Sequence, residues 1–438
     1  MRTCIINIMM TPGVTDEKHI PFLTDAEIHI DGNRIVYAGK SEDAPTFLSD
    51  HRIDGDGMLA IPGLINMHTH TPMSLLRNVG GDLRLEEWLH QAVFPLEACL
   101  TDEAVRFGTD LGILEMLRFG TTSFCDMYMR MNAVAEGVRD SGMRALLGHG
   151  IVDFDSNCED LEPGLALAEK WHMAENGRIR VSLSPHSEGA TTPALLRRVE
   201  QYAGELKLPI HIHVSETKHD FDGCMERRGL TPPQYLESLG LLQYPIIAAH
   251  CVWFTDEDIK LFAKRACTIV HNPVSNLKLA SGIAPIQKML ARGCKVAIGT
   301  DGVASNNNLN LWEELKLMPL LQKGITLDPT VVSPAQCLAS VTTVGARAMG
   351  YEDLGLLKEG FLADLILLDV SRPNMIPVND FESNLIFAAQ GGDVRLTMVD
   401  GKVLYQNGQY TALDAQSIMK KAKEAALELK QQARVKTR

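Results

Sequence analysis

The sequence predicts an α/β fold in which a (β/α)8 barrel of the TIM type carries a small β-sandwich domain built from both chain ends. From about residue 59 to residue 300, short strand-like runs alternate with longer helical patterns, as expected for parallel strands joined by crossover helices. Eight such runs can be counted, and eight parallel strands close a barrel. A hairpin pattern near each chain end accounts for the second domain.

Polar residues stand at or just beyond the ends of the eight predicted strands. The runs are Leu59–Asn66, Thr121–Cys125, Ala145–Gly148, Ile179–Ser184, Ile210–Val214, Ile246–Ala249, Thr268–Val270 and Val296–Gly299. The polar residues at these strand ends are His68 and His70, Asp126, His149, His186, His213, His250, His271 and Asp301. Active sites of such barrels lie at the carboxyl ends of the strands. Buried polar groups there are costly unless a ligand or metal satisfies them.

The two hairpins set the domain boundaries. Residues 27–37 alternate polar and apolar around Asp31-Gly32, and residues 396–405 repeat the pattern around Asp400-Gly401. We therefore assign residues 1–57 to the first part of the β-sandwich domain and 58–360 to the barrel. Residues 361–438 supply the second part and, from about Ser417, a surface helix with a basic end.

Composition narrows the class of partner. The chain has 438 residues and a formal net charge of -13, which repels phosphate backbones and anionic lipids. We expect a small-molecule substrate and neither a nucleic-acid polymer nor a membrane as partner. The nine cysteines contain no CxxC pair and predict reduced thiols in a cytoplasmic protein. The oligomeric state is left open, and a homo-oligomer is one option.

Four polar residues have the chemistry of a metal site. His68 and His70 share one face because side chains alternate along a strand, although such a pair can also simply line a polar pocket. His213 lies on the same face of its strand as His211, and Asp301 adds an oxygen donor. Three imidazoles and one carboxylate suit a divalent zinc or iron and leave room for a water.

Several motifs resemble one enzyme family. They are PGLINMHTH (62–70), HVSE (213–216), AHC (249–251), HNPVSNLKLASG (271–282), GTDGVASNN (299–307) and GFLADLILLD (360–369). These motifs resemble the amidohydrolase superfamily and, within it, are similar to the 5-methylthioadenosine/S-adenosylhomocysteine deaminases and their TRZ/ATZ chlorohydrolase relatives. The resemblance covers nearly the whole chain.

The resemblance implies that His68, His70, His213 and Asp301 hold one divalent metal, zinc in the first place and iron as the alternative. Binuclear relatives carry a bridging lysine after the fourth strand, where this chain has SPH (184–186), so we expect a single metal. A metal of this kind lowers the pKa of bound water from 15.7 toward roughly 7.

The resemblance also implies the catalytic roles. Glu216 moves a proton to the purine ring nitrogen, His250 orients the attacking water, and Asp301 accepts its proton. Both Glu216 and Asp301 therefore also contact the substrate. The implied reaction converts 5'-methylthioadenosine, or alternatively adenosine or S-adenosylhomocysteine, to the inosine analogue and ammonia.

The remaining substrate contacts follow from the same resemblance. His186 matches a histidine that contacts the purine, and Glu97 matches a glutamate that grips the ribose hydroxyls. Trp88 and Met73 are candidates for an apolar wall or ordinary packing residues. For His271 and Asp126 we expect structural roles.

One region departs from the family pattern. Relatives that accept S-adenosylhomocysteine place arginines near the end of the third strand, where this chain has His149 and no arginine between Arg144 and Arg178. The stretch from Asp153 to Glu162 is acidic instead, and a substrate carboxylate would be repelled there unless His149 or another basic residue held it. We therefore expect 5'-methylthioadenosine to be preferred over S-adenosylhomocysteine.

Two alternatives compete with this reading. The same metal set would serve a guanine deaminase or a triazine chlorohydrolase, because it determines how water is activated and not what is attacked. A non-catalytic scaffold barrel is the other alternative. The retention of His68, His70, His213, Glu216, His250 and Asp301 argues against it.

Overall fold

The computed structural model confirms the barrel. It describes all residues except 17, 81–82, 84, 154–160 and 437–438. Eight strands pair in parallel in the order of the chain. They are β6 (Leu64–Thr69), β7 (Thr121–Tyr128), β8 (Arg144–Ile151), β9 (Ile179–Pro185), β10 (Ile210–Val214), β11 (Ile246–His250), β12 (Cys267–His271) and β13 (Lys295–Ile298).

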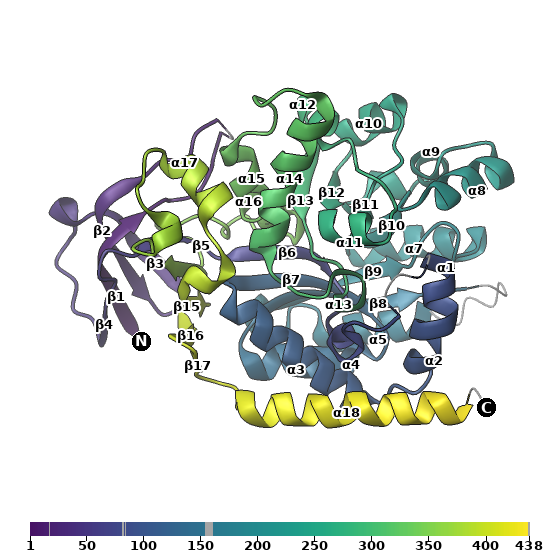
Figure 1. The fold of residues 1–438 in the computed structure, drawn as a ribbon, viewed down its shortest axis with the longest axis horizontal. Helices are drawn as coiled ribbons and strands as arrows, with labels where there is room; N and C mark the ends of the chain where they lie inside the picture. Colours follow the sequence, from purple (N-terminus) through teal and green to yellow (C-terminus); the bar gives the residue numbers. More distant parts are fainter. Residues whose placement is uncertain (17, 81–82, 84, 154–160, 437–438) are drawn as a thin grey trace.

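Helices cover the outside of this barrel (Figure 1). The barrel strands present isoleucine, leucine and valine side chains to them, and these form the largest buried cluster. The helices are α3 (Asp102–Arg118), α4 (Met131–Ser141), α5 (Leu161–Trp171), α6 (Ala174–Gly177), α7 (Pro193–Leu206), α8 (Lys218–Arg228), α9 (Pro232–Ser238), α10 (Asp256–Ala263), α11 (Pro273–Lys278), α12 (Ile286–Ala291), α13 (Val303–Asn306), α14 (Leu311–Thr326), α15 (Pro334–Ser340) and α16 (Thr343–Ala348).

The second sheet confirms that both chain ends build one small β domain. Its order is β17-β16-β15-β14-β5-β1-β2-β3, with β4 paired to β1. The strands are β1 (Arg2–Met10), β2 (Leu23–Asp31), β3 (Arg34–Lys40), β4 (His51–Asp54), β5 (Leu59–Pro62), β14 (Leu365–Leu368), β15 (Val394–Val399), β16 (Lys402–Gln406) and β17 (Gln409–Tyr410). Figure 1 shows this domain at one end of the barrel.

Both predicted hairpins are present, and their turns meet. β2 pairs with β3, and β15 pairs with β16. The side-chain amide of Asn33 donates to Asp400 over 3.1 Å. Gly401 has φ +74°, and a Cβ there would lie 2.2 Å from the carbonyl oxygen of Gly32. Only glycine therefore fits at this contact between the two ends of the chain.

The first predicted strand, Leu59–Asn66, is wrong as a single element. It is two strands in two sheets: β5 pairs with β1 and β14 of the β domain, and β6 begins the barrel. Pro62 has no amide hydrogen to continue a ladder. At Gly63 a Cβ would lie only 2.3 Å from the Thr122 side chain, so a larger residue would clash there. The chain crosses between the sheets at these two residues.

The predicted C-terminal helix is α18 (Ala415–Lys436). It packs against α3, against α2 (Phe94–Glu97) and against the 3-10 turn η2 (Thr71–Leu76). Its buried side chains are Ile418, Ala422, Ala425, Leu429 and Ala433. α2 belongs to a short helical segment with α1 (Leu85–Trp88), and Figure 1 shows both above the C-terminal half of α18. A further short helix is α17 (Phe381–Ser383).

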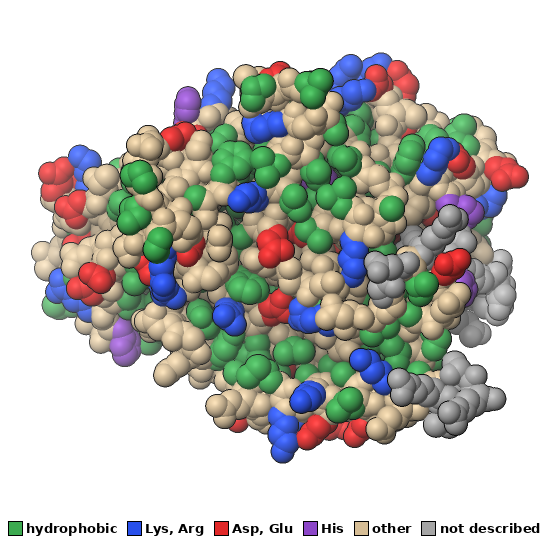
Figure 2. Space-filling model, viewed as in Figure 1, with side chains coloured by type: hydrophobic (Ala, Val, Ile, Leu, Met, Phe, Trp, Pro, Cys, Tyr) green, Lys and Arg blue, Asp and Glu red, His purple; other side chains and the backbone are tan. Residues whose placement is uncertain are grey.

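The surface in Figure 2 mixes charges of both signs with single exposed apolar side chains, and neither sign dominates this face. Among the described helices, none has the length and apolarity needed to span a membrane.

Candidate active site

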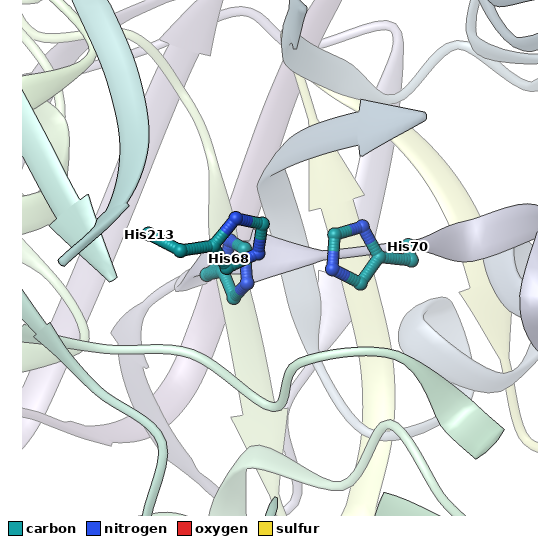
Figure 3. A group of neighbouring side chains, drawn as sticks. All are labelled: His68, His70 and His213. Carbon is teal, nitrogen blue, oxygen red and sulfur yellow. The ribbon is translucent and has the colours of Figure 1, made fainter. Parts of the chain in front are cut away.

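Three histidines converge at the carboxyl ends of the barrel strands. His68 lies on β6, His70 follows that strand, and His213 lies on β10. One ring nitrogen from each lies within 4.8 Å of the others, and Figure 3 shows the three rings facing a common space. The Oδ1 atom of Asp301 lies 3.5 Å from Nε2 of His68 and 3.2 Å from Nε2 of His70. The structure therefore brings the four predicted metal ligands together.

The second ring nitrogen of each histidine already has a partner. Nδ1 of His213 donates to the carbonyl of His186 over 2.7 Å, and Nδ1 of His70 donates to the carbonyl of Met127. Nδ1 of His68 lies 2.9 Å from Nε2 of His211. Such contacts fix the ring orientation and leave the Nε2 atoms for a metal.

The donor set fits a divalent metal. Nε2 of His68 is buried and has no hydrogen-bond partner among the described residues, which is costly for a polar atom unless an ion or ligand contacts it. Burial lowers the pKa of His68 to about 3 and that of His213 well below its ordinary value. Neutral imidazoles are the form that binds a metal. Three nitrogens and one carboxylate oxygen suit zinc.

Asp301 is held rigidly in the turn after β13. Its φ of +64° is unusual for a residue with a Cβ, and its amide donates to the carbonyl of His68 over 2.8 Å, which joins the last strand to the first. The carboxylate accepts from the amide of Gly302 and from the hydroxyls of Ser275 and Ser305. Burial alone would raise the pKa of Asp301, but the adjacent imidazoles of His68 and His70 hold it well below its usual range.

Asp126 anchors the turn around His70. Its carboxylate accepts from the amide and hydroxyl of Thr71 and from the hydroxyl of Thr69 over 3.2 Å. These two threonines flank His70. Asp126 is fully buried and is not among the residues that line the cavity, so its contacts are those of a structural residue.

Glu216 and His250 lie beside the four ligands. His250 ends β11, and its Nε2 atom is 3.7 Å from a carboxylate oxygen of Glu216. Its Nδ1 atom contacts the side-chain oxygen of Asn276 over 2.8 Å. Glu216 precedes the capping box of Thr217 that begins α8. Burial raises the pKa of Glu216 to about 7, a value suited to a group that gives and takes a proton near neutral pH.

A cavity of about 560 Å³ opens in front of these residues. Its lining includes the predicted substrate residues Trp88, Glu97 and His186, together with Met73. Its lining also includes the apolar residues Leu89, Val93, Phe94, Met129, Val152, Leu236 and Leu279. The hydroxyl of Tyr128 donates to the Glu97 carboxylate over 2.6 Å, and burial raises the pKa of Glu97.

His149 is not brought to this cavity. Side chains alternate along β8, and Gly148 faces Ser182 and Ser184 inside the barrel. His149 therefore lies on the outer face, where a Cβ on Gly164 of α5 would be 3.8 Å from it. His271 is likewise buried but is absent from the described cavity lining. Most of the acidic stretch from Asp153 to Glu162 lies outside the described residues.

Sequence reasoning did not identify four residues that support the site. They are Tyr128, Ser275 and Asn276, which contact Glu97, Asp301 and His250, and His211 in a contact to His68. Ser275 and Asn276 stand in the quoted motif 271–282, and His211 shares a strand face with His213, so the positions of these three residues were visible. A separate group in the β domain, Cys4, Glu27 and His29, also brings three donor atoms within 4.8 Å, and there His29 pairs with Glu27.

A family model decides the classification. Residues 59–404 match the amidohydrolase family. This chain belongs to that family. The match includes every strand of the barrel and the return into the β domain through β14 and β15.

Three known proteins are similar over almost the full length. A 5-methylthioadenosine/S-adenosylhomocysteine deaminase of Moorella thermoacetica is 44% identical over 91% of this chain and 94% of its own. A 5'-deoxyadenosine deaminase of Methanosarcina mazei is 42% identical over 87% of this chain and 89% of its own. The crystal structure of an adenosine deaminase of Xanthomonas campestris with bound zinc has a TM-score of 0.92 and 32% identity, and covers 98% of this chain and 99% of that one.

Proposed function

We propose that this amidohydrolase hydrolytically deaminates adenine nucleosides, with 5'-methylthioadenosine as the preferred substrate. The observation that carries the proposal is the composition of one cavity. Glu216, His250 and Asp301 line it together with Glu97, His186 and Trp88. A proton-transfer group, an acceptor for ribose hydroxyls and a wall for a purine are thus within reach of one bound nucleoside.

We further propose that His68, His70, His213 and Asp301 hold one divalent metal, zinc in the first place and iron as the alternative. Two observations on the described residues support this: the ring nitrogens converge, and the buried Nε2 of His68 has no hydrogen-bond partner among them. The zinc named for the Xanthomonas campestris structure supports it as well. When bound, such a metal lowers the pKa of a coordinated water and supplies a nucleophile at neutral pH.

The residues of the chain account for the protons. In the net reaction a C–O bond forms at C6 of the purine, the C–N bond to the amino group breaks, and ammonia leaves. Asp301 and His250 orient the attacking water and take its proton, and Glu216 delivers a proton to the ring nitrogen, because the ring must accept electron density as the water adds. The second water proton leaves with ammonia.

The nucleoside end of the site rests on Glu97 and His186. The Glu97 side chain is partly buried and has one carboxylate oxygen occupied by Tyr128, so the other is available to ribose hydroxyls. His186 lines the cavity, and its ring lies 4.5 Å from that of His213; both observations support a contact of His186 with the purine beside the metal ligands.

The charge of the cavity favours a neutral 5' substituent. None of its described lining residues is lysine or arginine, whereas five carry carboxylates: Glu97, Glu188, Glu216, Asp220 and Asp301. Of these, Glu188 is paired with Arg227. The carboxylate of S-adenosylhomocysteine would meet like charge, and a methylthio or deoxy group would contact apolar lining residues.

A substrate comparison tests the proposal. Protein of measured metal content is assayed with 5'-methylthioadenosine, 5'-deoxyadenosine, adenosine, S-adenosylhomocysteine, guanine and a chlorotriazine. We expect loss of adenine absorbance with one ammonia per turnover. We expect kcat/KM for 5'-methylthioadenosine at least about tenfold above that for S-adenosylhomocysteine, equivalent to roughly 1.4 kcal/mol.

Each other outcome has a defined meaning. Equal kcat/KM for S-adenosylhomocysteine and 5'-methylthioadenosine would remove the preference but keep the deaminase. Turnover of guanine or the triazine alone would move the enzyme to the other heteroaromatic class. A metal-loaded protein inert toward all six compounds would support the scaffold alternative.

The setting proposed for this enzyme is the cytoplasm. All eight described cysteines are free and buried, which is typical of a reducing compartment. A homo-oligomer remains compatible with the scattered exposed apolar side chains such as Leu320 and Leu327.

A further inference from the structure

The last three residues of β7 contact three different parts of the site. Asp126 accepts hydrogen bonds from the threonines on either side of His70. The carbonyl of Met127 accepts from Nδ1 of His70. The hydroxyl of Tyr128 donates to Oε1 of Glu97 over 2.6 Å. One strand end therefore touches both a metal ligand and the residue proposed to hold ribose.

The contact between Tyr128 and Glu97 joins two separate structural units. Tyr128 belongs to a barrel strand, whereas Glu97 ends α2 in a short helical segment outside the barrel. Among the described residues, no other side chain or amide hydrogen-bonds to the Glu97 carboxylate. The tyrosine hydroxyl is thus the polar link that fixes this carboxylate relative to the barrel.

The surroundings favour a fixed, directional contact. Tyr128 is buried, lines the cavity, and has its ring centroid 6.3 Å from that of His70. Burial and the neighbouring Glu97 hold the pKa of Tyr128 well above its ordinary value, so the hydroxyl keeps its proton and can only donate to a carboxylate. Hydrogen bonds from a neutral donor to a charged acceptor are short and strong.

We propose that Tyr128 is a positioning residue that orients the Glu97 carboxylate toward the ribose hydroxyls and so determines how tightly the nucleoside binds. This rests on the proposed function, because it needs Glu97 to contact ribose. Without the tyrosine proton, Glu97 would keep its charge but lose its fixed direction. Binding of the sugar would weaken while proton transfer at Glu216 and the metal site would be unaffected.

The first test is Tyr128→Phe in the full-length, metal-loaded enzyme. We expect KM for 5'-methylthioadenosine to rise about tenfold or more, the effect of losing a hydrogen bond to a charged group. We expect kcat to change by less than about twofold, and the metal content to stay the same. The matched control is Tyr244→Phe, which removes a hydrogen bond of 2.9 Å from a tyrosine to Glu200 away from the cavity and should leave KM unchanged.

A double-mutant cycle with Glu97→Gln decides whether Tyr128 acts through Glu97. We expect Tyr128→Phe to add less than about twofold to KM in the Glu97→Gln background, because the residue it orients is already altered. Independent, multiplicative effects would overturn the positioning role and leave the proposed ribose contact standing. An unchanged KM in Glu97→Gln would remove the ribose contact itself, and the inference with it.

A change of substrate gives a second readout that survives partial misfolding. For 2',3'-dideoxyadenosine, which lacks the ribose hydroxyls, we expect wild type and Tyr128→Phe to have the same KM. Inactive protein lowers the rate for every substrate alike and leaves this comparison of KM intact. A similar rise in KM for the dideoxynucleoside would show that Tyr128 acts on something other than the sugar contact.

Discussion

Single residues in this site act in pairs of one ligand and one supporting contact. Each of the three histidines proposed to bind the metal uses Nδ1 for a contact outside its own strand and leaves Nε2 for the metal. The contacts are to the carbonyls of His186 and Met127 and to the ring of His211. The meeting of His68, His70, His213 and Asp301 could be predicted from the sequence, because each lies at or just past the end of a strand. Their partners could not, because these contacts join positions up to 143 residues apart.

Glu216 carries the first residue-scale prediction. Its pKa of about 7 means that the protonated form, which can donate to the ring nitrogen, is present below that pH and is lost as pH rises. We therefore expect kcat/KM to fall on the alkaline side above about pH 7. Glu216→Gln should lower kcat by about 10²–10⁴-fold and abolish this part of the pH profile, measured by initial rates between pH 5 and 9.

The control is Asp222→Asn on the exposed side of α8, six residues farther along the chain, which should keep both the rate and the pH profile. The metal content of Glu216→Gln should equal that of wild type, since Glu216 is not one of the four ligands. An unchanged alkaline limb in the variant would assign that titration to another group.

At the scale of elements, the eight barrel strands could be predicted, and their boundaries could not. β7 was expected to end at Cys125 and continues to Tyr128, and that error hid the contact to Glu97. His149 follows its predicted strand directly, but β8 also continues past it, so alternation turns its side chain outward. The neighbouring Gly148 could have indicated this direction, because serine side chains of β9 fill the space inside the barrel next to it and leave no room for a Cβ.

The contact of α18 with α2 gives the element-scale prediction. Leu429 is buried in an apolar cluster that includes Trp88, Val93 and Leu96 from the short helical segment of α1 and α2. We expect Leu429→Ala to lower the free energy of unfolding by about 2–5 kcal/mol through loss of apolar contacts and the cavity left behind. Denaturant unfolding measures this. Leu427 of the same helix is 52% exposed, and Leu427→Ala should change stability by less than about 0.5 kcal/mol.

Equal losses in the two variants would mean that helix propensity, and not packing on α2, sets the stability of this region. Leu→Ala costs little in propensity, since both residues favour helices. The two positions therefore separate packing from propensity.

At the scale of the whole molecule, two sheets are held together by polar as well as apolar contacts. Arg144 begins β8 and donates through Nε and a terminal nitrogen to both carboxylate oxygens of Asp364, over 2.9 and 3.0 Å. The same arginine lies 3.3 Å from Asp400 in the turn of the C-terminal hairpin. The sequence predicted two domains from their strand patterns. It gave no sign of this link, because the partners are 220 residues apart.

Breaking this buried pair tests how far the β domain stabilises the barrel. The side chains of Arg144 and Asp364 are both 1% exposed, so Asp364→Ala leaves an arginine that water cannot reach. We expect a loss of about 3–5 kcal/mol in unfolding free energy, measured in denaturant.

The double variant Arg144→Met/Asp364→Leu should be less destabilised than Asp364→Ala alone, because it leaves no unpaired buried charge between those two positions. Arg139→Met, which removes a half-exposed surface pair with Asp140, should cost no more than about 1 kcal/mol. A double variant as unstable as the single one would show that the direction of the hydrogen bonds, and not the compensation of charge, holds the β domain on the barrel.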